Sequence, residues 1–347
     1  MSATKIEWAT HTVNWLAGCS HCSPGCDNCY AETMSRRLAT MGQPRYQGVT
    51  KGGAWTGKVE YDRLALYRAF DGLRNARKPR RVFVNSMSDT FHPAAPWEAV
   101  VDLAKAIKAA NGQRWHGDEW RFDLDLHTTR LHSRAHVLML LTKRPTRLLA
   151  WQREHFPGGL PPWVWVGVTV EDQERVDQRV PVLLQVQASV RFVSCEPLLG
   201  AVRLDDVAHI TGTGQTIIDA LAGDYPNLRA FLPGVPRPPR LSWVIVGGES
   251  GPHARPMHPE WARSLRDQCQ AAEVPFFFKQ WGEWAPLEWS CVIDADKSRV
   301  SLSDGYPDGH MEWRPYHLFD DGREMARVGK KYVGREIDSE TWAEVPR

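Results

Sequence analysis

Four of the seven cysteines lie within one short stretch near the start of the chain: Cys19, Cys22, Cys26 and Cys29. Their spacings are C-x2-C, C-x3-C and C-x2-C. Thiolates this close together are typical of a metal site, because thiolate sulfur is a strong ligand for zinc and for iron. The crowding therefore indicates chemistry in addition to packing.

Three kinds of site compete for these thiols. A structural zinc site usually joins two cysteine pairs across a longer loop, whereas only three residues separate Cys22 from Cys26. A disulfide is disfavoured, since we find no signal peptide before the cysteines and expect a reducing compartment. Three thiolates around an iron–sulfur cluster would leave one iron open to a cofactor or substrate. We favour this third interpretation, and a zinc-binding module for nucleic acid or protein interaction stays as the alternative.

The stretch also resembles a known superfamily. The spacing Cys22-x3-Cys26-x2-Cys29 is similar to that of radical S-adenosylmethionine (SAM) enzymes, whose cluster loop follows the first strand of a parallel βα barrel. Asn28 departs from the pattern, because many of those enzymes carry an aromatic residue just before the last cysteine. The longer pattern G-C-x6-C-x2-C-Y-A, which begins at Gly18, resembles a phage-associated three-cysteine family of the same superfamily.

The two patterns share two ligands and differ in the third. Cys26 and Cys29 belong to both, while the longer pattern adds Cys19 and the shorter one adds Cys22. The resemblance thus implies that three of the four thiols hold a 4Fe-4S cluster with SAM on its open iron. It further implies reductive cleavage of SAM to a 5′-deoxyadenosyl radical, which abstracts a hydrogen atom from the substrate.

The rest of the chain alternates β-branched runs with helical stretches. We predict seven buried strands, at residues 12–16, 81–86, 135–141, 164–168, 189–193, 243–246 and 275–278. Such alternation is typical of a parallel sheet. We expect an α/β fold, a partial or nearly closed parallel βα (TIM-like) barrel over residues 1–284. Insertions are expected at about 111–134 and 204–240, and a C-terminal extension, 285–347, should pack on the barrel.

Polar side chains follow these strands at the edge where a βα barrel gathers its ligand site. The resemblance implies that strand ends hold the amine, carboxylate and ribose of SAM. Ser86, Ser88 and Asp89 follow the second strand, where the superfamily commonly receives the amine. Lys143 follows the third strand and could bind a carboxylate or phosphate. Further candidates for the cofactor or substrate are Thr169, Glu171, Ser194, Glu196 and Glu249.

One cysteine outside the cluster ends a predicted strand. Cys195 follows the fifth strand, so it could face the site as a hydrogen-atom donor. It is the single catalytic side chain that we name, although a buried cysteine is more often inert.

The amino-acid composition says little about whether the protein binds nucleic acid. The formal net charge is +2, a value that neither requires nor excludes nucleic acid. Basic residues between Arg74 and Arg81 and around Lys143, together with some of the 16 tryptophans, could bind a nucleic acid strand. The phage-associated resemblance suggests base modification or lesion repair, and an electron donor such as a flavodoxin or ferredoxin. No apolar run reaches the roughly 18 residues of a membrane span, so we expect a cytoplasmic protein.

Overall fold

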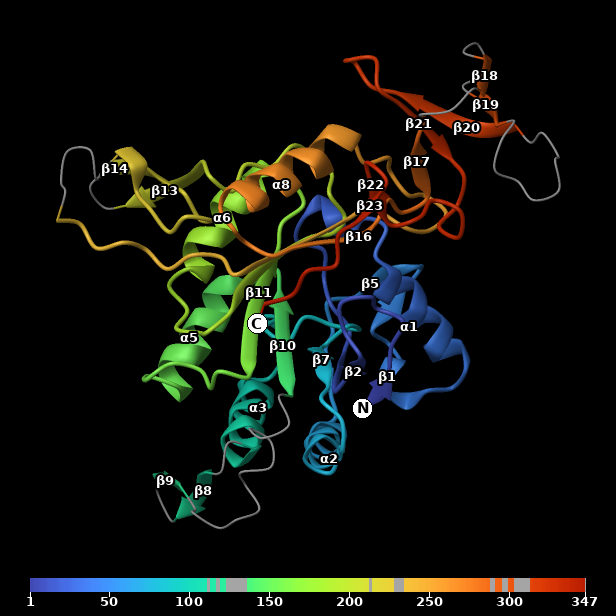
Figure 1. Cartoon of the computed structure of the whole chain (residues 1–347). Helices are drawn as coiled ribbons and strands as arrows, with labels where there is room; N and C mark the ends of the chain where they lie inside the picture. Colours follow the sequence, from blue (N-terminus) through green and yellow to red (C-terminus); the bar gives the residue numbers. More distant parts are fainter. Residues whose placement is uncertain are drawn as a thin grey trace.

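The alternating runs form one large, mostly parallel sheet (Figure 1). The computed structural model describes residues 1–110, 113–116, 119–122, 136–211, 214–227, 234–287, 291–294, 299–302 and 313–346. The strands of the sheet, in spatial order, are β1 (Ser2–Ala3), β2 (His11–Val13), β7 (Arg81–Val84), β10 (Val137–Thr142), β11 (Val164–Thr169), β12 (Arg191–Cys195), β15 (Trp243–Gly247) and β16 (Phe276–Gln280). Only β1 pairs with its neighbour in the antiparallel sense.

The seven parallel strands correspond to the seven predicted runs. Most of these runs are rich in β-branched residues, while β16 begins with three phenylalanines; buried parallel strands require such continuous apolar stretches. Within the described ranges the edge strands β1 and β16 do not pair with each other. The fold is therefore mixed α/β with an open sheet, compatible with a βα barrel-like arrangement, and no closed barrel is formed by these residues.

Helices cover one face of the sheet (Figure 1). They are α2 (Arg63–Arg74), α3 (Trp97–Ala110), α5 (Pro145–His155), α6 (Gln173–Leu183) and α8 (Pro259–Ala271). Their apolar side chains pack with strand residues such as Val82 and Val84. None of the helices in the described part of the chain is both long and apolar enough to cross a membrane.

The opposite face, which we call the inner face, carries an aromatic layer. Because successive strand residues point to opposite faces, Phe83 leaves β7 on this side while Val82 and Val84 face the helices. The buried members of the layer include Trp8, Phe83, Met139, Trp165, Phe192, Trp243 and Phe277. Trp8 belongs to the segment before β2, and Val345 near the other end of the chain also packs here. Both ends of the chain thus cover the inner face.

Short strands and the C-terminal region surround the sheet. The small pairs are β3 (Leu16–Ala17) with β6 (Glu60–Tyr61), β4 (Thr50–Lys51) with β5 (Ala54–Trp55), β8 (Gln113–His116) with β9 (Glu119–Phe122), β13 (Val207–Thr211) with β14 (Gly214–Ile218), and β22 (Glu336–Ile337) with β23 (Glu340–Thr341). A five-stranded sheet contains β17 (Trp284–Pro286), β21 (Glu324–Arg327), β20 (Trp313–Leu318), β19 (Arg299–Leu302) and β18 (Cys291–Asp294).

The predicted insertions and extension fall partly on these elements. The pair β8–β9 lies in the first predicted insertion, whose residues 111–112, 117–118 and 123–134 are outside the described ranges. The pair β13–β14 lies in the second. The C-terminal region contacts the edge of the main sheet, where Phe278 N donates to Trp342 O at 2.9 Å and Trp243 Nε1 donates to Glu344 O at 2.8 Å. The domain boundary at 284–285 stays a prediction.

A buried carboxylate links the segment around α2 to α3. Asp102 on α3 is fully buried, and it accepts hydrogen bonds from Arg63 Nη2 at 3.0 Å, from Tyr67 OH at 3.3 Å and from Tyr61 OH. A carboxylate without water is stable only when such partners are present.

Replacing this carboxylate tests the link. We expect Asp102→Ala to lower the free energy of unfolding by about 2 kcal/mol, because three donors lose their shared acceptor. Urea denaturation measures the change. Glu98→Ala is the matched control, since Glu98 is exposed and lies 3.6 Å from the same Arg63; an exposed pair contributes less than about 1 kcal/mol. Equal losses in both variants would contradict a structural role for Asp102.

Candidate functional site

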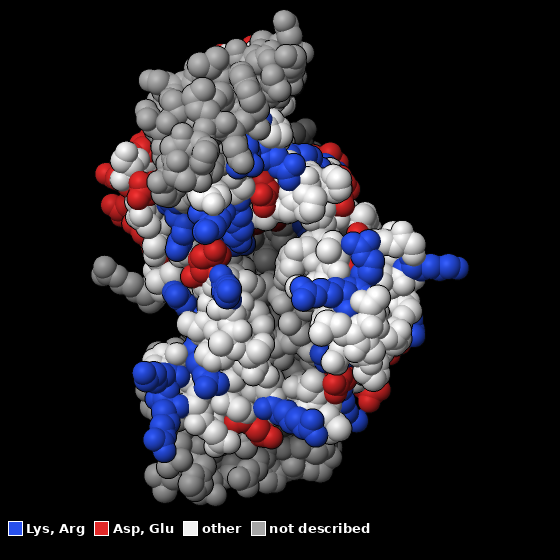
Figure 2. All heavy atoms as spheres, turned by 90° about the vertical axis from the view of Figure 1, so that its right-hand side faces the viewer, with Lys and Arg blue, Asp and Glu red and all other residues white. Residues whose placement is uncertain are grey.

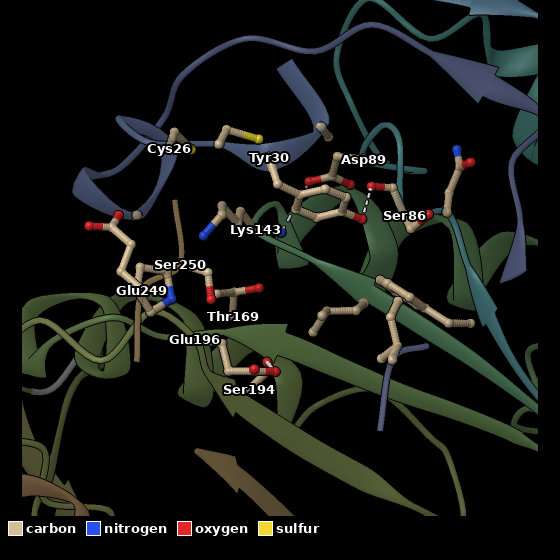
Figure 3. A pocket seen from close by; sticks show the side chains of 18 of the residues that line it. Cys26, Tyr30, Ser86, Asp89, Lys143, Thr169, Ser194, Glu196, Glu249 and Ser250 are labelled. Atoms are coloured by element: carbon tan, nitrogen blue, oxygen red, sulfur yellow. Dashed lines mark hydrogen bonds between the residues drawn. The ribbon is translucent and has the colours of Figure 1, made fainter. Parts of the chain in front are cut away.

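A cavity of about 580 Å³ lies at the carboxyl ends of the parallel strands. Its volume is in the range of roughly 300–1,000 Å³ that is common for small-molecule sites. Figure 3 shows side chains from several strand ends pointing into it, among them Lys143, Thr169 and Glu196. The predicted site residues that line the cavity are Cys19, Cys26, Cys29, Ser86, Ser88, Asp89, Lys143, Thr169, Ser194, Glu196 and Glu249.

Three predicted site residues do not line this cavity. Cys22 is exposed and lines an adjoining surface depression, which shares Lys143 and Arg144 with the cavity. Glu171 is fully buried behind Lys143. Cys195 lies among apolar side chains on the helix-covered face. Our expectation that Cys195 faces the site is therefore corrected, because Ser194 takes the cavity side and the next residue of a strand must point the other way.

Glycines allow the loop that carries the cysteines, residues 18–29, to pack closely. Gly18 follows β3 with φ +95°, and a Cβ there would lie 2.0 Å from the carbonyl oxygen of Lys58. A Cβ on Gly25 would lie 2.5 Å from Glu171 Oε1. At Gly18 no other residue type fits without backbone movement, whereas a side chain at Gly25 would have to displace the Glu171 carboxylate. The loop contains the 3₁₀ helix η1 (Pro24–Cys26) and leads directly into α1 (Tyr30–Thr40).

Arg144 holds the first half of this loop. Its Nη2 donates to Ser20 O and to Ser20 Oγ, both at 3.1 Å, and its Nη1 donates to Asp89 Oδ2 at 2.9 Å. Asp89 also accepts from Thr142 Oγ1 at 2.7 Å and from Lys143 N at 3.0 Å. Both carboxylate oxygens of Asp89 thus have protein partners. Their arrangement makes Asp89 a positioning residue for Arg144 at the cavity wall.

Arg255 holds the second half of the loop. Its Nη2 donates to Pro24 O at 2.8 Å and to Glu249 Oε1 at 2.6 Å, and its Nη1 lies 3.2 Å from Asp27 Oδ2. Asn28 Nδ2 donates to Glu249 Oε2 at 2.9 Å. Sequence analysis missed Arg255, since one arginine in an irregular loop carries no periodic signal.

The charge environment keeps Glu249 ionised. Burial alone would raise the pKa of the Glu249 carboxyl, but the hydrogen bonds from Arg255 and Asn28 outweigh burial and lower this pKa.

A third buried carboxylate lies beneath the loop. Glu171 Oε1 accepts from Ser23 Oγ at 2.7 Å and is paired with Lys143, while Arg179 Nη1 donates to Glu171 Oε2 at 3.0 Å. Burial would raise the pKa of Glu171, yet Lys143 and Arg179 lower it. Glu171 therefore supports the cysteine loop and Lys143 from below.

The thiols differ in how readily they ionise. Burial raises the pKa of Cys19 to about 11. A hydrogen bond from Cys22 lowers the pKa of Cys26 to about 5 and raises that of Cys22 itself. The thiolate is the form of cysteine that binds metal. Over the described ranges, no group of three or more His, Cys, Asp or Glu side chains is arranged as ligands of one metal ion.

An ion pair forms the polar part of the inner-face wall. Lys279 Nζ lies 2.8 Å from Glu196 Oε1, and Glu196 Oε2 accepts from Ser194 Oγ at 3.1 Å and from Trp8 Nε1 at 3.2 Å. Sequence analysis missed Lys279, although a signal was available: it stands two residues after Phe277 on β16, so both side chains point to the inner face.

Replacing Arg255 should lower the stability of the fold by an amount that depends on pH. We expect Arg255→Leu to lower the free energy of unfolding by about 2–3 kcal/mol at pH 7, because Glu249 is left buried and charged without its main partner. In the wild type the lowered pKa of Glu249 gives stability that is lost as the pH falls through that pKa. In the variant this pKa rises, so the difference between the two proteins should shrink toward pH 4. Urea denaturation at several pH values measures it.

Arg203→Leu provides the matched control. Arg203 is exposed and makes comparable contacts with half-buried Asp205 at 3.0 Å, far from the cysteines in the sequence. Its replacement should change stability little at any pH. A loss in Arg255→Leu that does not vary with pH would contradict the role of Glu249.

Comparisons with known proteins identify the family. No curated protein matches the chain. Among solved structures, a spore photoproduct lyase complexed with dinucleoside spore photoproduct is similar, with 11% identity and a TM-score of 0.37 over 95% of this chain and 71% of that one. A family profile described as "Protein of unknown function (DUF5131)" matches residues 3–116 and 119–346. The chain therefore belongs to the family that carries this description.

Proposed function

We propose that the protein is a radical SAM enzyme in which Cys19, Cys26 and Cys29 hold a 4Fe-4S cluster. One observation carries the proposal: these three thiols line the same cavity as the polar strand ends, whereas Cys22 lines a different surface depression. This difference favours the longer pattern G-C-x6-C-x2-C-Y-A over the shorter C-x3-C-x2-C.

The donor types present suit such a cluster, although in the described part of the chain the thiols do not surround one metal ion. Thiolates are its usual ligands, and three of them leave one iron open. The two arginines fix both halves of the loop, so the sulfur atoms are held at the cavity wall. When bound, the cluster supplies the electron that cleaves SAM to a 5′-deoxyadenosyl radical, which takes a hydrogen atom from the substrate.

The side chains around the thiols provide groups for SAM. Lys143 and Arg144 supply positive charge for its carboxylate. Thr169 and Ser194 line the cavity with hydroxyl groups that suit the ribose. Apolar side chains of the wall, such as Trp8 and Phe83, would exclude water from the reacting carbon. The fixed strand ends would align one C–H bond of the substrate.

Cysteine variants test the assignment of ligands. After anaerobic reconstitution, we expect the wild type to contain about four irons per chain and to absorb at about 400 nm. It should form 5′-deoxyadenosine when reduced with SAM. Cys19→Ala should lose the iron and the product. Cys22→Ala should keep both, because the Cys22 side chain is outside the cavity.

Cys269→Ala is a further control, since Cys269 is buried in α8 away from the loop. Loss of iron in Cys22→Ala but not in Cys19→Ala would select the shorter pattern instead. A colourless protein that binds one zinc and forms no 5′-deoxyadenosine would overturn the proposal and favour a zinc-binding module.

We further infer that the substrate is a nucleic acid. Lys5 and Lys330 line the cavity, and Figure 2 shows Lys and Arg side chains on both sides of a hollow in the face that carries α1. Such a border suits a phosphate backbone. The cluster would also require an electron donor of the flavodoxin or ferredoxin type.

Salt dependence tests this inference. Lys5→Ala and Lys330→Ala should each weaken binding of a single-stranded oligonucleotide and reduce the salt slope of the affinity by about 1. Fluorescence anisotropy at several salt concentrations measures both. Lys108→Ala is the control, because Lys108 lies on α3 and stacks on Phe156. An affinity that does not respond to salt would contradict backbone binding.

A further inference from the structure

Asn85 is an unpaired polar side chain in the wall of the cavity. It is only 3% exposed, and neither its Nδ2 nor its Oδ1 has a hydrogen-bond partner among the residues that the structure describes. Buried amides are almost always paired, because leaving one unpaired costs free energy. An amide of this kind in a ligand-sized cavity indicates that its partner is a ligand.

An aromatic wall lies next to this amide. Asn85 lies just after the end of β7, and both Asn85 and Phe83 line the cavity. The Trp8 ring packs on Phe83 with a centroid distance of 4.8 Å, and both line the cavity. The Trp8 ring is fixed in turn by its hydrogen bond to Glu196 at 3.2 Å. The cavity thus offers one hydrogen-bond donor and one acceptor, side by side on the Asn85 amide, next to flat apolar rings.

This part of the cavity adjoins the part assigned to SAM, since Glu196 accepts hydrogen bonds from both Trp8 and Ser194. In Figure 3, Ser86, the residue after Asn85, lies on the opposite side of the Tyr30 ring from Cys26 and Lys143. Tyr30 OH donates to Ser86 O at 2.6 Å, which fixes that ring across the cavity. We take the amide to face a second molecule that binds next to SAM.

We propose that Asn85 and the Phe83–Trp8 wall bind a nucleobase of the substrate. The inference rests on the proposed function and deepens it by naming the recognised group. An asparagine amide presents one donor and one acceptor side by side, which matches the edge of a base. Aromatic rings beside it accept the face of the base. A carboxylate or phosphate offers no donor to Oδ1, and a hydrocarbon would leave the whole amide unpaired.

Nucleoside binding tests the proposal. The probes are thymidine, deoxycytidine, deoxyadenosine and deoxyguanosine, added to the reconstituted full chain with saturating SAM and followed by equilibrium dialysis. At least one nucleoside should bind, and Asn85→Leu should weaken that binding about tenfold or more, the effect of losing one bidentate contact to a base. Asn75→Leu is the control, since Asn75 is an exposed residue after α2, and it should leave the affinity unchanged.

A chemical change in the probe makes the test specific. Methylating the base nitrogen that donates should weaken binding to the wild type and have no further effect in Asn85→Leu, because the same contact is removed twice. Asn85→Asp is a second variant of nearly the same shape, which replaces the donor by an acceptor and should also lose affinity. Thermal unfolding checks that both variants fold.

Other outcomes overturn the proposal. Equal nucleoside affinity in the wild type and both Asn85 variants, or no binding either with or without SAM, removes the base site. A nucleoside that binds in an Asn85-dependent way only when SAM is left out would assign the amide to the adenine of the cofactor instead. The two proposals can fail separately. Asn85-dependent binding without formation of 5′-deoxyadenosine would contradict the radical SAM function alone. Formation of 5′-deoxyadenosine without such binding would contradict the base site alone.

Discussion

The position of the cysteine loop depends on buried carboxylates that are neutralised by arginines. Asp89 fixes Arg144 and Glu249 fixes Arg255, and each guanidinium then donates to backbone oxygens of the loop. A buried charge without its partner is destabilising, so removing either member of a pair should destabilise the protein. Because both carboxylates follow strands of the central sheet, the loop is placed by charge pairs that the sheet itself positions.

Much of this arrangement follows from the sequence. Buried parallel strands need continuous apolar runs, and the runs end in polar residues where the sheet meets solvent. The seven strands and the polar strand ends could therefore be predicted. The alternation of side chains was also available, and it would have placed Cys195 opposite Ser194. Arg255 could not be found this way, because its partners lie far away in the sequence and only the folded chain brings them together.

The inner face shows a second limit of sequence reasoning. The aromatic residues of the strands predict an apolar layer, but nothing in the polar segment before β2 indicates that Trp8 completes it. The same holds for Asn85, whose lack of partners is visible only once its surroundings are known. The sequence does not reveal that a side chain lacks a hydrogen-bond partner, or that a remote segment packs beside it. Both become visible only in the tertiary structure.

The close approaches at Gly18 and Gly25 have a consequence for how the protein matures. Both glycines let the loop pack directly against Lys58 and the Glu171 side chain, and these contacts are made within the chain itself. In small zinc domains the metal orders the chain, and a chelator unfolds them. If the loop holds the cluster that we propose, these contacts would let the polypeptide fold first and receive the cluster afterwards, and a chelator would then strip the cluster and leave a folded apoprotein.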